Sequence, residues 1–108
     1  MNIFKITTND ANETFINING VRCLIDKAPG TANGLNYYMV YCKEGRGLYT
    51  FCADITTRNN EIYSQYHSNN NALNNALICK GNAHDMDSAM YKALTNITEL
   101  FKLEHGLK

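Results

Sequence analysis

Four cysteines and three histidines are the residues of this sequence that could hold a soft metal ion or act as nucleophiles and bases. The cysteines stand at positions 23, 42, 52 and 79, and the histidines at positions 67, 84 and 105. Zinc sites usually take their ligands from close pairs of Cys or His on a turn. The sequence has no such pair, and its cysteines fall in apolar segments, where a free Cys usually behaves as a small buried hydrophobe. We therefore expect four reduced thiols, no metal and no cofactor.

Catalysis by a nucleophile would require a Cys or Ser beside a base and an orienting acid. His84 and Asp85 are adjacent, but neighbours in sequence need not meet in catalytic geometry, and Asp85 also suits the start of a helix. Asp54 and Glu61 could approach each other across a hairpin, although two surface carboxylates at a strand end explain them equally well. Residues 45–47 (Gly-Arg-Gly) indicate a hairpin tip and not a phosphate-binding loop. Because no catalytic motif is present, we rank an enzyme below the two binding functions that are considered at the end of this section.

Composition sets the class of the protein. The chain has 108 residues, of which 44% are hydrophobic and 19% are charged, so we expect one globular domain over residues 1–108. The formal net charge is zero, which disfavours both a broad phosphate-binding surface and an acidic mimic of DNA. The first residues lack the pattern of a secretory signal, and no apolar run is long enough to span a bilayer. We expect a cytoplasmic protein without membrane association.

The asparagine content is unusual. The sequence contains sixteen asparagines, one proline and no tryptophan. This composition indicates an AT-rich coding sequence, as is frequent for small proteins of phages and mobile elements.

The elements that must position any site are clearest in the first half of the chain. Asn19 and Gly20 separate two apolar runs, which predicts a β-hairpin over residues 14–26 with a type I′ turn. A short strand is expected before it, over residues 3–7. Residues 35–43 and 48–56 form a second predicted hairpin, joined either by a two-residue loop at 45–46 or by a four-residue loop at 44–47.

Both loops give the second hairpin the same register, with paired positions that sum to 91. Met39 then faces Cys52, and Cys42 faces Tyr49. The alternation of side chains predicts a core face made of Tyr38, Val40, Cys42, Tyr49, Phe51, Ala53 and Ile55. Because Cys42 and Cys52 are then on opposite faces, this register predicts that they cannot form a disulfide.

The second half predicts a further strand over residues 61–66 and two helices. A short helix is expected over residues 72–79, ending at Gly81. A long helix begins at Asp85 or Asp87 and ends at Gly106, with Lys102 near its negative end. Its apolar positions follow the helical period and are Met86, Met90, Ala93, Leu94, Ile97, Leu100 and Phe101. The predicted fold is therefore α+β, an antiparallel sheet of four or five strands with both helices on one face.

The face of the second hairpin opposite its predicted core face carries the candidate binding site. It combines Tyr37, Met39, Tyr41 and Leu48 with the loop residue Arg46. An exposed stripe of Tyr, Met and Leu is typical of a protein interaction surface, unless another element covers it. The same tyrosines could stack nucleic-acid bases, but the neutral charge removes the main source of affinity for phosphate.

From these features we expect a small intracellular module that binds another protein. The composition suggests an inhibitor of a host defence complex encoded by a phage or mobile element, similar in role to an anti-CRISPR protein and acting by steric occlusion. A nucleic-acid-binding accessory protein is the alternative, and an orphan enzyme is the second alternative. A homodimer is compatible with the sequence as well.

Overall fold

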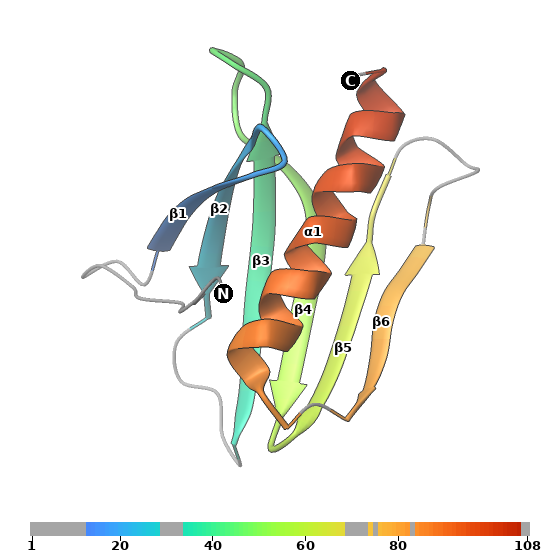
Figure 1. Ribbon diagram of the computed structural model, residues 1–108. Helices are drawn as coiled ribbons and strands as arrows, with labels where there is room; N and C mark the ends of the chain where they lie inside the picture. Colours follow the sequence, from blue (N-terminus) through green and yellow to red (C-terminus); the bar gives the residue numbers. More distant parts are fainter. Residues whose placement is uncertain (1–12, 29–33, 69–73, 75, 83, 107–108) are drawn as a thin grey trace.

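The computed structural model describes residues 13–28, 34–68, 74, 76–82 and 84–106. These residues form one antiparallel sheet of six strands in sequence order, with the helix α1 lying diagonally across one face (Figure 1). The strands and the helix are β1 (Glu13–Ile18), β2 (Val21–Lys27), β3 (Leu35–Lys43), β4 (Thr50–Arg58), β5 (Glu61–Tyr66), β6 (Ala76–Asn82) and α1 (Met86–His105). The predicted α+β class, antiparallel sheet and C-terminal helix are confirmed. The strand expected over residues 3–7 lies outside the described residues.

The first hairpin forms as its turn sequence predicts. Asn19 and Gly20 have φ angles of 56° and 77°, and Ile18 pairs with Val21 directly across the turn. A type I′ turn requires positive φ at both central positions, which Asn and Gly tolerate best. The turn also contacts α1, because the Asn19 side-chain amide donates to Thr98 Oγ1 at 3.1 Å.

Helix α1 begins and ends at the predicted caps. The Asp85 carboxylate accepts from the backbone N–H and the hydroxyl of Ser88, and these bonds lower the pKa of Asp85. Gly106 has a φ of 67° and closes the last turn in the left-handed conformation. The buried side chains of the helix, spaced at its period, are Met90, Ala93, Leu94, Ile97, Thr98 and Phe101.

The core lies between α1 and one face of the sheet, which we call the helix face. Alternate residues of β1 to β5 point to this face and most of them are buried, as in β2, where Val21, Cys23 and Ile25 are at most 2% exposed. None of the described elements packs on the opposite face, which we call the open face (Figure 1). The single helix therefore divides the sheet into a buried side and an accessible side.

The short helix predicted over residues 72–79 is wrong within the described residues, because residues 76–82 form strand β6. Ser64 of β5 pairs with Cys79, and Ile62 pairs with Gly81. The backbone of β5 offers a row of hydrogen-bonding groups to its neighbour, and pairing with them outweighs a weak local preference for helix. Gly81 lies within β6 and pairs with Ile62, so it does not end a helix. Within the described residues the sheet therefore has six strands and not four or five.

The predicted register of the second hairpin is also wrong. Met39 pairs with Asp54 and not with Cys52, and the loop between the strands spans residues 44–49. Val40 pairs with Ala53 whereas the next residue, Tyr41, pairs with Phe51. Residue 52 is therefore the extra residue of a β-bulge, which alternation alone does not reveal.

The bulge exchanges two side chains between the faces of the sheet. Phe51, predicted in the core, is 40% exposed on the open face, and Cys52, predicted on the other face, is only 3% exposed. Cys52 Sγ lies 3.0 Å from Cys42 Sγ. The two thiols therefore share the helix face, and the predicted separation that would prevent a bridge does not exist. Tyr49, also predicted in the core, is half-buried in the loop.

Candidate functional site

The open face presents a continuous apolar row across four strands. Phe15 of β1 pairs with Leu24 of β2, Leu24 pairs with Tyr41 of β3, and Tyr41 pairs with Phe51 of β4. Paired residues of neighbouring strands point to the same face, so these side chains form one line across the sheet. Together with His67, whose ring stacks on Phe51 at a centroid distance of 5.5 Å, we call them the aromatic row.

Three rings of the aromatic row, Tyr41, Phe51 and His67, contact one another in succession, and the row leaves much of its surface accessible. Tyr41 and Phe51 meet edge to face at 5.6 Å, a favourable geometry for aromatic rings. Phe15 is 51% exposed and Phe51 is 40% exposed. Monomeric proteins seldom leave several large apolar side chains exposed side by side, so such a row indicates a binding surface.

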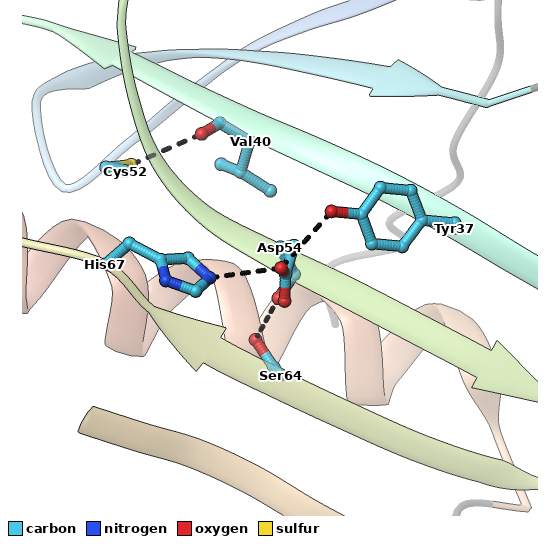
Figure 2. Close-up of polar contacts among 6 residues, drawn as sticks. All are labelled: Tyr37, Val40, Cys52, Asp54, Ser64 and His67. Atoms are coloured by element: carbon cyan, nitrogen blue, oxygen red, sulfur yellow. Dashed lines mark hydrogen bonds and ion pairs between the residues drawn. The ribbon is translucent and has the colours of Figure 1, made fainter. Parts of the chain in front are cut away.

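Asp54 organises the polar side of this face. The Tyr37 hydroxyl donates to Asp54 Oδ2 at 3.2 Å, and His67 Nε2 lies 3.1 Å from the same oxygen (Figure 2). The buried Ser64 hydroxyl donates to the main-chain carbonyl of Asp54 from the neighbouring strand. Burial first, and then the charge of Asp54, raise the pKa of Tyr37, so Tyr37 remains a hydrogen-bond donor at neutral pH. These contacts hold the His67 ring where it stacks on Phe51.

An acidic row runs beside the aromatic row. It lies two residues further along the strands and consists of Glu13, Asp26 and Asp54, with Met39 between the two aspartates. Met39 also accepts a weak hydrogen bond through its sulfur from the Tyr41 hydroxyl, at 3.8 Å. The row therefore places three carboxylates along one border of the apolar surface.

A basic pair borders the other side. Arg22 of β2 lies directly opposite Lys43 of β3, and Lys43 Nζ stands 4.8 Å from the centre of the Tyr49 ring. Like charges directly opposite each other destabilise the pairing of two strands, so the stability of the fold does not explain why Arg22 and Lys43 are placed here. At about 3.3 Å per residue, four residues separate the basic pair from the acidic row by about 13 Å. The open face thus changes from negative to positive charge across an apolar centre.

The predicted binding residues divide into two groups. Tyr37, Met39 and Tyr41 are half-buried on the open face, as the alternation of β3 requires. Leu48 is 89% exposed and Arg46 is exposed, and both belong to the loop that joins β3 and β4. The structure places the first group within or beside the aromatic row and the second group at the end of the sheet.

The residues that sequence reasoning did not identify are mainly those of other strands. Phe15 and Leu24 occupy alternate positions in the first hairpin, so the same period-2 rule could have placed them on this face. Phe51 reaches it through the bulge, and His67 reaches it from the residue that follows β5. No local sequence signal identifies the last two.

A pocket opens at the rim of the sheet, near the C-terminal end of α1. It has a volume of about 290 Å³ and is lined by Thr50, Phe51, Cys52, His67, Ser68, Asn74, Phe101, Glu104 and His105. Glu104 accepts hydrogen bonds from Tyr66, at 2.5 Å, and from Ser68. Burial and the contact with Glu104 raise the pKa of Tyr66. We call this cavity the rim pocket.

The two carboxylates that the sequence offers as a pair, Asp54 and Glu61, are not brought together. Asp54 pairs with Gln65 whereas Glu61 pairs with Arg58, so the two carboxylates stand at different positions along the sheet. Asp85 caps α1, as its alternative interpretation predicts. Within the described ranges, no group of three or more Cys, His, Asp or Glu side chains has the arrangement of a metal site.

Two further findings bear on the class of the protein. The helix in the described part is too polar to cross a lipid bilayer. Comparison of this chain with protein-family models, with curated proteins and with solved structures finds no significant match.

Proposed function

We propose that this protein is a protein-binding module and that the open face is its binding surface. The observation that carries the proposal is the aromatic row, which crosses four strands in register and exposes Phe15 and Phe51. Aromatic side chains supply much of the binding energy at protein interfaces because each one buries a large area. The polar contacts around Asp54 hold His67 against Phe51, and a preorganised surface loses less entropy on binding.

The charges define the chemistry of the partner. A complementary protein surface would carry an apolar centre, basic side chains opposite the acidic row, and acidic side chains opposite Arg22 and Lys43. Such an arrangement fixes the orientation of the partner and speeds its association. A nucleic acid fits less well, because its phosphates would approach the carboxylates of Glu13, Asp26 and Asp54 across the same face.

A rigid sheet bound in this way would act by covering a surface that its partner needs. The asparagine-rich, tryptophan-free composition supports the more specific proposal of an inhibitor from a phage or mobile element, directed at a host defence complex. Steric occlusion is the mechanism that we propose for it.

The test compares three forms of the affinity-tagged full chain in a bacterial lysate, with the retained proteins quantified by mass spectrometry. The forms are wild type, the double variant Phe15→Ala/Phe51→Ala, and Leu103→Ala. Leu103 is the matched control, because it is an apolar residue that is 68% exposed but lies on α1. An aromatic anchor contributes about 2 kcal/mol or more, or roughly thirtyfold in affinity.

We expect wild type and Leu103→Ala to retain the same partner protein in equal amounts, in low and in high salt. The double variant should not retain it. Equal retention by all three forms would exclude the open face as the binding surface. Retention that nuclease treatment or high salt abolishes would support nucleic-acid binding instead. If light scattering shows that wild type and Leu103→Ala are dimers and that the double variant is a monomer, then a second copy of the chain occupies the open face, and a heterologous partner is excluded.

A further inference from the structure

Three buried cysteines lie side by side on the helix face, one on each of three neighbouring strands. Cys23 of β2 pairs directly with Cys42 of β3, and Cys52 of β4 is the bulge residue next to them. Cys23 and Cys42 have no exposed surface, and Cys52 is 3% exposed. Cys42 Sγ and Cys52 Sγ are 3.0 Å apart, so a disulfide would require the sulfur atoms to move about 1 Å closer.

Only one of these three thiols lines the rim pocket, and it is Cys52. The pocket volume of about 290 Å³ is ample for a molecule of the size of water, which occupies about 30 Å³ in the liquid. His67, His105 and Glu104 line the same pocket, and each carries a group that can accept a proton. A small oxidant in this pocket would therefore meet Cys52 first, with Cys42 directly behind it.

We propose that Cys52 and Cys42 form an oxidisable dithiol, in which hydrogen peroxide in the rim pocket oxidises Cys52, and Cys42 then forms a disulfide with it. In the first step the Cys52 sulfur attacks one peroxide oxygen, the O–O bond breaks, and one molecule of water leaves. In the second step the Cys42 sulfur attacks the resulting sulfenic acid, the S–O bond breaks, and a second water leaves. The two sulfurs lose two electrons, the peroxide gains them, and both thiol protons end in water.

The environment of the other two thiols agrees with this order of events. The contact with Cys42 and burial raise the pKa of Cys23. The contact with Cys23 lowers the pKa of Cys42, but the contact with Cys52 and burial raise it by more. Protonated thiols react slowly with peroxides, so neither residue is a direct target. Cys42 acts through its position, since a separation of about 3 Å is that of a near-attack arrangement.

The sequence allows the bridge to be located without any substitution. Trypsin places each cysteine in a different peptide, because Arg22, Lys27, Lys43, Arg46 and Arg58 separate the first three from one another and from Cys79. The reduced full chain is treated with hydrogen peroxide, unfolded in the presence of an alkylating agent, and digested without reductant. We expect peptides 28–43 and 47–58 to be linked, with a mass about 2 Da below their sum, and to separate in dithiothreitol.

Three variants test the roles of the individual thiols. Cys52→Ala should leave Cys42 and Cys23 reduced, and Cys42→Ala should stop Cys52 at a sulfenic acid that dimedone traps. Cys79→Ala is the matched control and should form the bridge as wild type does, since Cys79 is half-buried on β6. A bridge from Cys42 to Cys23 or Cys79 in the wild type would overturn the proposal. So would full alkylation of Cys42 and Cys52 after a large excess of peroxide.

Discussion

Phe51 and Phe101 provide the sharpest test of the division of the sheet into two faces. They are the same residue type, yet Phe51 is 40% exposed on the open face whereas Phe101 is 3% exposed between α1 and the helix face. Replacing each by Ala removes the same atoms from two environments. The difference between the two losses of stability therefore measures how much of the Phe51 side chain is accessible to solvent on the open face.

The expected losses follow from the buried areas. A phenylalanine buries about 200 Å² when it is fully covered, so Phe51, with about three fifths of its surface covered, buries about 120 Å². At about 25 cal/mol per Å² this corresponds to at most about 3 kcal/mol, and Ala retains part of it, so we expect a loss of about 1.5–2 kcal/mol. Phe101→Ala also leaves a cavity in the core and should cost about 3–5 kcal/mol.

Chemical denaturation of the two variants beside wild type measures both losses. The gap of about 2 kcal/mol corresponds to a difference in Tm of about 8–16 °C for a domain of this size. Leu103→Ala, on the exposed side of α1, should stay within about 0.5 kcal/mol of wild type. If Phe51→Ala destabilises the protein as much as Phe101→Ala does, then a second layer covers the aromatic row, and the argument for a free binding surface fails.

Two further predictions concern the fold. Gly20→Ala should lower stability by about 1 kcal/mol in urea denaturation, because Gly20 has a φ of 77° and adopts a conformation that alanine disfavours; an unchanged midpoint would argue against the type I′ turn. The pKa of Tyr66 is raised, so the folded state holds the phenol proton more tightly than the unfolded chain does. The stability that this proton contributes is therefore complete below a pH of about 10 and declines as the pH rises above that value. Tyr66→Phe should therefore weaken the fall of Tm above pH of about 10, and an identical alkaline profile would show that Tyr66 is not responsible.

The parts of the fold that could be predicted are those that neighbouring residues determine. Asn19 and Gly20 specify their turn, and Asp85 and Gly106 specify the ends of α1, because each acts on the backbone within a few residues of itself. The state of residues 76–82 depends instead on pairing with β5, which is a contact between segments, and local preference alone favoured a helix.

The candidate site shows the same limit. Alternation along β3 was sufficient to place Tyr37, Met39 and Tyr41 on one face, whatever the partner strand. The contribution of β4 was not predictable in this way, because one extra residue at position 52 reverses the direction of every side chain before it in the strand. The pattern of apolar and polar residues in a strand does not reveal at which residue a β-bulge shifts its pairing with the neighbouring strand.

The bulge at Cys52 is also what connects the two proposals. It turns Phe51 outward to the aromatic row and, with the same irregularity, sets Cys52 against Cys42 on the helix face. A bond between the two sulfurs would therefore fix the β-bulge between β3 and β4, and the outward position of Phe51 depends on this bulge. Oxidation of the dithiol would thus act on the geometry of the open face through a single residue of β4, although the two features lie on opposite sides of the sheet.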